Sequence, residues 1–217
     1  MLSGGLTLLL GSADDFFDLS PVVKLSFQII ISLIASAILS PSESLIYVII
    51  KSFYILLLIN AFNFIDGLDG LCVGISIASL FFFSLSDLLF LDTGTGVSAI
   101  LLLFSLVGFV PFNAYPAKLY MGDAGSQTLG LSVAIFSLAF SNDGLYMTPV
   151  FLLIPITDVI LTVIRRLCVG KSPFKPDRAH LHHKLLDLGL SHPGAVNLLI
   201  FISLFASLLS LSAYILA

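Results

Sequence analysis

Two neighbouring carboxylates, Asp14 and Asp15, belong to the first of four polar segments in this otherwise apolar chain of 217 residues. Adjacent carboxylates at a helix end can bind Mg²⁺, or one of them can act as a general base. Lys24 follows and shares a helical face with Gln28, four residues later, so this pair can hold a phosphate or anchor a helix end. The alternative interpretation is a solvated pair of aspartates beside a helix anchor.

The second segment, residues 60–70, holds Asn63, Asp66 and Asp69 among glycines, between two long apolar stretches. Amides and carboxylates in such surroundings cost free energy unless they have a function. The glycines allow an irregular backbone that can approach a ligand closely. The alternative is a turn between two helices. A turn needs fewer of these residues than the segment contains, which favours a binding role.

The third segment, residues 113–126, ends in Gly-Asp-x-Gly-Ser, immediately before an apolar stretch. This pattern places the carboxylate of Asp123 beside the free backbone N–H groups of a helix start. Such an arrangement suits a metal ion and a bound phosphate. The alternative is a helix cap, which accounts for either Asp123 or Ser126 but not for both together with the paired glycines.

The fourth segment, residues 172–184, contains Arg178 and three histidines, His180, His182 and His183. Three histidines within four residues suggest zinc, but no Cys or Glu stands nearby to complete a tetrahedral site. Arg and His at this density favour the binding of a diphosphate or a nucleotide. The alternative is a basic loop attracted to anionic lipid, which explains the Lys and Arg residues but not the histidines.

The elements that must position these segments are membrane-spanning helices. The chain is 58% hydrophobic and 10% charged, whereas soluble domains carry about 25% charged residues. A spanning helix needs about 20 mostly apolar residues and satisfies its backbone internally. We therefore expect an all-α polytopic helix bundle of about seven spans, a single integral membrane domain over residues 1–217. The candidate spans are residues 22–39, 45–62, 70–91, 97–113, 125–140, 145–164 and 195–216.

Basic residues gather on one side of this predicted topology. With seven spans, eight of the nine Lys and Arg residues lie on the same side, which the positive-inside rule makes cytoplasmic. Lys51 is the exception, and its side chain can reach the opposite interface from within its span. The four polar segments share the basic side, so we expect one site at the cytoplasmic face. The net charge of −4 gives no indication of a nucleic-acid partner, since the chain has no basic domain surface of the kind that binds nucleic acid, and we expect none.

Several polar residues lie outside the four segments. Asp158 falls within a predicted span, and an intramembrane carboxylate is a functional hypothesis by default. Pro155, just before it, predicts a kink in that span. His192 is interpreted as an ordinary loop residue. Three carboxylates near the opposite face are expected to be solvated: Asp87, Asp92 and Asp143.

In their order, the four segments resemble the motifs of the polyprenyl-phosphate N-acetylhexosamine-1-phosphate transferases, glycosyltransferase family 4, from Gly11 to about Leu190. The sequence Asp-Arg-Ala-His-Leu-His-His at 177–183 resembles the GlcNAc-type branch. The resemblance implies transfer of a sugar 1-phosphate from a UDP-N-acetylhexosamine, UDP-GlcNAc or a near relative, to undecaprenyl phosphate in the plasma membrane. UMP would be released, and the product would start a lipid-linked cell-envelope glycan.

The resemblance also implies a role for each matching residue. It gives catalytic roles to Asp14, Asp15 and Asp123, and assigns Asp123 and Asp15 to Mg²⁺, with Mn²⁺ as the alternative ion. Which of Asp14 and Asp15 acts as the base stays open. The implied substrate-binding residues are Lys24 near the acceptor phosphate, Asn63, Asp66 and Asp69 in the nucleotide pocket, and Arg178, His180, His182 and His183 in the loop that holds the sugar diphosphate.

Family members carry about three further spans before the aspartate pair, so we expect this chain to be an N-terminally shortened version. One alternative is therefore a shortened member with impaired catalysis. Another is a transporter that uses Asp158 and the other aspartates as a cation path. Transporters place such sites near the membrane midplane in repeated halves, and no repeat is visible here. The choice of sugar, the downstream polymer and a homodimer stay open.

Overall fold

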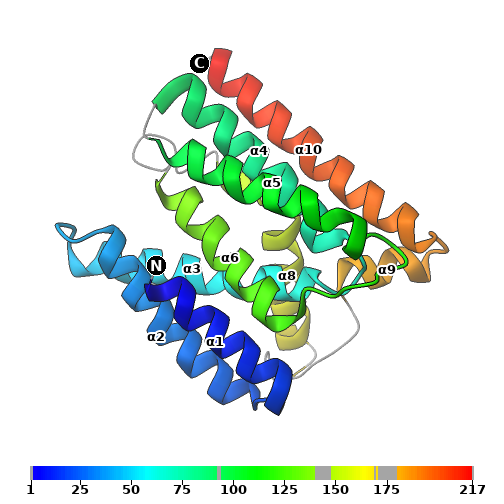
Figure 1. Cartoon of the computed structure of the whole chain (residues 1–217), viewed down its shortest axis with the longest axis horizontal. Coiled ribbons are helices and arrows are strands. Elements are labelled where there is room, and N and C mark those ends of the chain that lie inside the picture. Colours follow the sequence, from blue (N-terminus) through cyan, green and yellow to red (C-terminus); the bar gives the residue numbers. More distant parts are fainter. Residues whose placement is uncertain (1, 92–93, 140–147, 169, 171–179, 217) are drawn as a thin grey trace.

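The fold consists of helices and their connections throughout the part of the chain that this computed structural model describes, residues 2–91, 94–139, 148–168, 170 and 180–216 (Figure 1). No strand occurs in these ranges. The elements in chain order are α1 (Leu2–Phe17), α2 (Pro21–Leu39), α3 (Leu45–Ile65), α4 (Leu71–Ser86), the π-helix η1 (Asp87–Leu91), α5 (Thr95–Asn113), α6 (Gly122–Ala139), α7 (Thr148–Phe151), α8 (Leu153–Cys168), α9 (Leu181–Asp187) and α10 (His192–Leu216).

Five helical segments are long and apolar enough to cross a membrane: Pro21–Leu39, Leu45–Ile65, Leu71–Phe90, Thr95–Asn113 and His192–Ala213. They confirm the predicted all-α membrane bundle. Two of the seven predicted spans are not among these five segments of the described chain. α6 opens with the polar sequence Gly-Asp-Ala-Gly-Ser-Gln-Thr, and the predicted span 145–164 is interrupted at Leu152, between α7 and α8. The number of spans therefore stays a prediction.

Pro155 stands in the first turn of α8, so the kink predicted there is instead a break between two helices. A proline in the first turn removes no hydrogen bond of its own helix. The missing N–H of Pro155 would otherwise have paired with the carbonyl of Phe151, four residues earlier. The hydroxyl of Ser79 in α4 donates to that carbonyl at 2.9 Å, so the break leaves the Phe151 carbonyl hydrogen-bonded.

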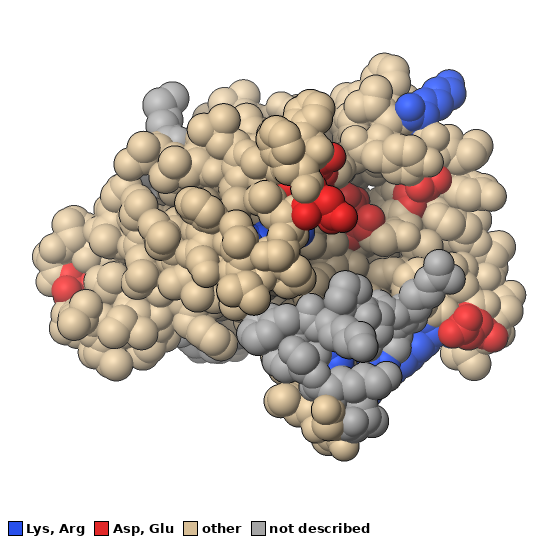
Figure 2. Space-filling view, turned by 90° about the horizontal axis from the view of Figure 1, so that it is seen from below, with Lys and Arg blue, Asp and Glu red and all other residues tan. Residues whose placement is uncertain are grey.

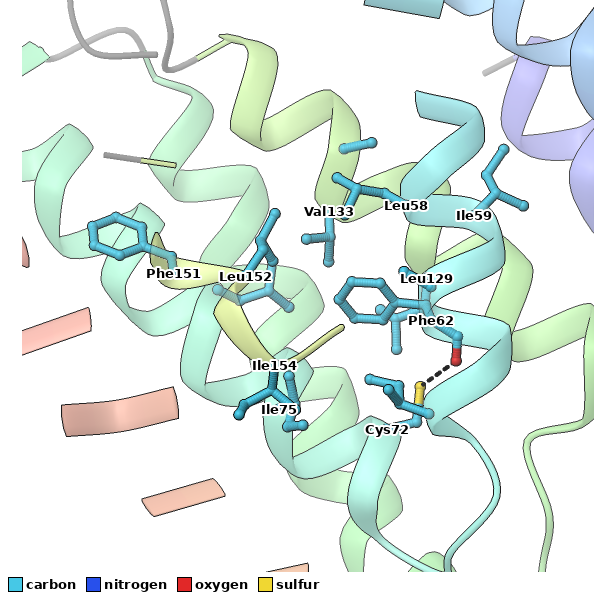
Figure 3. Close-up of a cluster of buried hydrophobic side chains, with 14 of the residues drawn as sticks. Leu58, Ile59, Phe62, Cys72, Ile75, Leu129, Val133, Phe151, Leu152 and Ile154 are labelled. Carbon is cyan, nitrogen blue, oxygen red and sulfur yellow. Dashed lines mark hydrogen bonds between the residues drawn. The ribbon is translucent and has the colours of Figure 1, made fainter. Parts of the chain in front are cut away.

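The centre of the bundle is α3, which packs against α2, α6 and α8. Its buried side chains include Leu58, Ile59 and Phe62, and Figure 3 shows Leu58 and Phe62 next to Val133 of α6. Gly130 allows the two helices to cross in backbone contact, because a Cβ at that position would lie 2.6 Å from the carbonyl oxygen of Leu58. This crossing sets the end of α3 beside the start of α6.

α1 packs against the start of α6 through Gly11. A Cβ at Gly11 would lie 2.6 Å from the backbone nitrogen of Ala124 and 2.6 Å from the carbonyl oxygen of Asp123. Any larger residue would therefore push the two helices apart. Asp14 and Asp15 follow about one turn later in α1, so this close approach brings both carboxylates next to Asp123.

Lys51 lies near the start of α3 and reaches the connection between α2 and α3. Its Nζ donates to the hydroxyl of Ser40 at 2.9 Å and to the carboxylate of Glu43 at 2.5 Å. The side chain thus reaches away from the middle of its helix, as expected from its place early in a predicted span.

Asp87 is buried at the other end of α4, with 4% of its surface exposed. Its Oδ2 accepts a hydrogen bond from the backbone N–H of Gly96, in the first turn of α5, at 2.8 Å. A carboxylate is favourable there because it satisfies a free amide of a helix start. The prediction that Asp87 is solvated is therefore wrong. Asp92 and Asp143 lie outside the described residues.

Candidate active site

The predicted site residues come from helix ends that meet at one end of the bundle. Figure 2 shows acidic side chains gathered around a hollow on the face seen from below. Two adjoining cavities, a larger one of about 510 Å³ and a smaller one of about 280 Å³, share Asn63, Asp66 and Gly67 in their walls. Ten of the eleven predicted site residues line one or both cavities. The eleventh, Arg178, lies outside the described residues.

Lys24 bridges two carboxylates in this site. Its ammonium group, at the start of α2, forms ion pairs with Asp14 of α1 and Asp123 of α6. Burial and the hydrogen bond with Asp123 raise the pKa of Asp14, although Lys24 acts in the opposite direction. Burial would also raise the pKa of Asp123, but hydrogen bonds from Asp14, Lys24 and Asn63 lower it to about 2. Of the two groups, Asp14 is the better proton acceptor.

Asp15 has different neighbours from Asp14. Its two oxygens accept hydrogen bonds from the backbone N–H groups of Asp123 at 2.8 Å and Ala124 at 3.0 Å, so it caps the start of α6. Gly122 has a φ of +65°, and a Cβ there would lie 2.9 Å from the carboxylate of Asp15. Glycine therefore permits this cap. The predicted role of Asp15 as a metal ligand stays a prediction.

A row of amides from α2, α3 and α6, in which Gln28 and Gln127 are buried, ends on Asp123. Asn60 donates to Gln28 at 3.0 Å, Gln28 donates to Gln127 at 3.1 Å, and Gln127 donates to Oδ2 of Asp123 at 3.0 Å. Asn63 donates to the other oxygen, Oδ1, at 2.9 Å. These bonds fix the orientation of the carboxylate. Sequence reasoning missed Gln127, although an amide one turn after Asp123 in an apolar helix was a usable signal.

The smaller cavity carries an excess of negative charge. Four carboxylates line it, and no Lys or Arg stands among its described lining residues. Burial, followed by the charges of Asp123, Asp15 and Asp69, raises the pKa of Asp66 to about 7. Hard oxygen ligands and a surplus of carboxylates fit Mg²⁺, which binds through one or two carboxylates with phosphate and water oxygens. Within the described residues no group of three or more His, Cys, Asp or Glu side chains could hold a metal, so substrate oxygens would have to complete the shell.

Asp69 ties the second polar segment to the third and to α10. Its Oδ2 accepts the backbone N–H of Ala117 at 2.9 Å, and its own N–H donates to Nε2 of His192 at 3.3 Å. The ring of His192 stacks on Tyr115, with centroids 4.3 Å apart. The interpretation of His192 as an ordinary loop residue is therefore wrong, because this ring holds two walls of the site together.

His182 in α9 is the most buried of the three histidines, with 1% of its surface exposed. Burial and the neighbouring His183 lower its pKa to about 4, so the ring is neutral at pH 7. Neither ring nitrogen has a hydrogen-bond partner within the described part of the chain. Buried polar atoms of this kind are rare, and here they lie in the wall of the larger cavity. His182 is thus suited to bind a polar ligand.

Two further residues of α8 belong to the histidine side of the site. Arg166 is buried, lines the larger cavity and lies over the ring of Phe64 at 5.9 Å. Sequence reasoning counted Arg166 only as a topology-determining charge. Asp158 contacts Nδ1 of His180 through Oδ2 at 3.0 Å, so the intramembrane carboxylate belongs to the surroundings of the histidines.

Fold and site together define a class of protein: a membrane helix bundle whose helix ends gather carboxylates, a lysine and histidines around two cavities. The chain belongs to glycosyl transferase family 4, because the family model matches residues 1–141. This confirms the family predicted from the four segments.

Three named relatives show which members of the family the chain is similar to. The chain is 33% identical over 208 residues to the undecaprenyl-phosphate alpha-N-acetylglucosaminyl 1-phosphate transferase of Thermotoga maritima, covering 94% of the chain and 66% of the relative. It is 38% identical over 173 residues to a probable undecaprenyl-phosphate N-acetylglucosaminyl 1-phosphate transferase of Bacillus subtilis, covering 72% and 44%. For the phospho-N-acetylmuramoyl-pentapeptide-transferase of Staphylococcus aureus, the identity is 35% over 179 residues, covering 82% and 56%. The first two names agree with the predicted GlcNAc branch. The chain spans only 44–66% of the length of these relatives.

Proposed function

We propose that this protein transfers GlcNAc 1-phosphate from UDP-GlcNAc to undecaprenyl phosphate and releases UMP. The names of the relatives from T. maritima and B. subtilis support the sugar and the lipid acceptor. The observation that carries the proposal is the position of Lys24 between Asp14 and Asp123, since Lys24 and Asp14 also line the cavity that holds His180, His182 and His183.

In the proposed step, an oxygen of the lipid phosphate attacks the phosphorus that carries the sugar. A P–O bond forms to the lipid phosphate, the bond from that phosphorus to the bridging oxygen breaks, and UMP leaves with the electron pair. Such a transfer depends on positioning and charge neutralisation more than on covalent help. Lys24 pairs with the lipid phosphate. Asp14, whose pKa is raised, accepts the proton of a singly protonated phosphate.

Asp123 would hold Mg²⁺ at the wall of the smaller cavity, where Asp15, Asp66 and Asp69 add negative charge. When bound, Mg²⁺ or Mn²⁺ neutralises charge on the phosphate oxygens. The neutral ring of His182, together with Arg166, hydrogen-bonds the sugar diphosphate in the larger cavity.

The site faces the cytoplasm in this proposal, because the basic residues lie on the same side of the predicted topology. Cysteines introduced at Ser42 and at Ala124, in a background without Cys168, test this orientation. Ser42 lies between α2 and α3, whereas Ala124 lies at the site. An impermeant thiol reagent added outside the cell should label the first and not the second; the reverse pattern would overturn the orientation.

The alternatives make different use of the same residues. A cation path through the membrane needs carboxylates near the midplane, whereas Asp14 and Asp123 lie at helix ends and pair with Lys24. The geometry therefore favours group transfer over transport. A family member with impaired catalysis remains the alternative that only an assay separates from the proposal.

Exchange of labelled UMP into UDP-GlcNAc tests the proposal. Membranes that contain the protein should catalyse this exchange, because transfer between two phosphoanhydrides is nearly balanced and reversible. The reaction should require both undecaprenyl phosphate and a divalent ion. Exchange that proceeds without the lipid, or no exchange with both present, would contradict the proposed function.

A further inference from the structure

Asp158 lies in α8, is only 2% exposed, and uses its two carboxylate oxygens for two different contacts. Oδ2 lies 3.0 Å from Nδ1 of His180. Oδ1 accepts the backbone N–H of Leu181, the first residue of α9, at 2.6 Å. One buried carboxylate thus holds both a ring and a helix start, which lie 22 and 23 residues further along the chain.

We propose that Asp158 is a positioning residue of the transferase site: it keeps the proton of His180 on Nδ1 and fixes the start of α9, so that Nε2 of His180 and the ring of His182 are presented to the diphosphate of the sugar nucleotide. This inference rests on the proposed function. Asp158 itself does not contact the reacting atoms. It acts through the two histidines.

The contact with Nδ1 determines the tautomer of His180. An ionised carboxylate can only accept hydrogen bonds, so Nδ1 must carry a proton. Nε2 is then left for the larger cavity, which His180 lines. The carboxylate behind the ring therefore fixes which nitrogen is presented to an anionic phosphate. The hydroxyl of Thr162 also lies near Nδ1, at 3.4 Å, farther away than the carboxylate.

The contact with Leu181 determines the position of His182. His180 occupies the capping position of α9 without a side-chain cap of its own, so the acceptor for the first amide comes from α8 instead. His182 follows in the first turn, with its ring parallel to that of His180 and the centroids 5.7 Å apart. It packs directly on Gly67, where a Cβ would lie 2.8 Å from Cε1 of the ring. A shift of α9 would therefore move both rings relative to the cavity wall.

The substitution Asp158→Asn separates the two contacts. The amide oxygen of Asn can still accept from Leu181, while its NH₂ group turns toward His180 and donates to Nδ1. The proton of the neutral ring should then move to Nε2. ¹⁵N NMR of histidine-labelled protein, with His180 assigned by His180→Gln, should show protonated Nδ1 in the wild type and protonated Nε2 in Asp158→Asn.

The kinetic readout is the KM for UDP-GlcNAc in the UMP exchange assay. We expect Asp158→Asn to raise it about tenfold, the lower end of the loss seen when a metal-binding histidine loses its carboxylate partner. The KM for undecaprenyl phosphate should change less than about twofold. In a His180→Ala background the same substitution should raise the KM for UDP-GlcNAc less than about twofold, since the effects of residues that act through one another are not additive.

Asp87→Asn is the matched control. Asp87 is also buried and also accepts a backbone N–H from another helix start, but it lies outside both cavities. The substitution Asp87→Asn should lower the unfolding temperature as much as Asp158→Asn does and leave the KM for UDP-GlcNAc unchanged. A merely structural role for Asp158 predicts the same behaviour for both variants.

Two results would overturn the inference: an unchanged His180 tautomer in Asp158→Asn, or an undiminished effect of that substitution in the His180→Ala background. A wild-type protein that exchanges no UMP would instead contradict the proposed function. In that case the tautomer still decides the role of Asp158, together with the affinity for UDP, measured by calorimetry, of the wild type, Asp158→Asn, His180→Ala and the double variant.

Discussion

The carboxylate of Asp15 accepts a hydrogen bond from the backbone N–H of Asp123 at 2.8 Å, although the two residues lie 108 positions apart in the chain. A second bond, from the N–H of Ala124, completes a cap on α6. The preceding residue, Asp14, pairs with Lys24 instead. Two adjacent carboxylates therefore have separate tasks in the structure: one holds the start of α6, and the other lies beside the cation that reaches Asp123.

Substitution of each aspartate should separate these tasks. Asp14→Asn should lower UMP exchange by about 100-fold or more, as expected for loss of a general base, with an unchanged unfolding temperature. Asp15→Ala should lower the free energy of unfolding by about 1 kcal/mol through loss of the cap. Asp15→Asn keeps an acceptor oxygen. It should therefore lose less UMP exchange than Asp14→Asn and less free energy of unfolding than Asp15→Ala. A loss of exchange in Asp15→Asn as large as that in Asp14→Asn, without destabilisation, would give Asp15 a chemical role.

Asp123→Asn should abolish exchange and Mg²⁺ binding while the protein stays folded and inserted. A neutral amide is a poor ligand for a hard cation, but it can keep a hydrogen bond to Asn63 or Gln127. Exchange assays and Mg²⁺ titration calorimetry check the two losses. Exchange in Mg²⁺ above a small fraction of the wild-type rate would remove Asp123 from the metal site.

Mg²⁺ should bind more tightly as the pH rises from 6 to 8. The pKa of Asp66 is raised to about 7 by burial and by Asp123, Asp15 and Asp69. Its carboxyl group is therefore mostly protonated at pH 6 and ionised at pH 8, and a protonated carboxyl does not attract the ion. Below the pKa, the affinity should rise by up to about tenfold per pH unit. Titration calorimetry at pH 6, 7 and 8 measures this, and Asp66→Asn should remove the dependence. A pH-independent affinity in the wild type would contradict it.

Gln127→Leu should cost both stability and activity, because it interrupts the row of amides that ends on Asp123. The substitution leaves the buried amide of Gln28 without its acceptor, which costs about 1–3 kcal/mol. It should also reduce exchange, since the carboxylate of Asp123 loses a donor. Thr128→Ala is the control: its hydroxyl bonds the carbonyl of Ala124 in its own helix. If both variants behave alike, the amide row does not orient Asp123.

His182→Ala should raise the KM for UDP-GlcNAc by about 10- to 100-fold, because a hydrogen bond to a charged group contributes about 1.5–3 kcal/mol. Lys184→Ala, an exposed residue on the same helix α9, should leave it unchanged. If the segment served only to attract anionic lipid, the order would reverse, since each lysine near the surface contributes about 1 kcal/mol to that attraction. Equal effects would remove His182 from the donor site.

Much of this protein could be predicted from its sequence, because the determining properties are local. Apolar runs of sufficient length indicate helices in a membrane, and five of the seven predicted runs are such helices in the structure. The polar segments stood out because carboxylates and histidines are costly beside apolar stretches. Ten of the residues chosen on that basis line the two cavities, while their catalytic and binding roles stay predictions.

The tertiary structure decided which group each polar side chain meets. Asp14 and Asp15 are neighbours of the same type, yet Gly11 sets α1 against α6 so that one meets Lys24 and the other meets backbone amides. Asp87 and His192, expected in solvent or in a plain loop, have partners on other elements. Composition and spacing determine whether a polar group lies at a helix end or within a span, because the positions of helix ends and spans depend on the hydrophobicity of nearby residues. Its partner comes from a distant helix, and only the packing of the helices sets that distance and orientation.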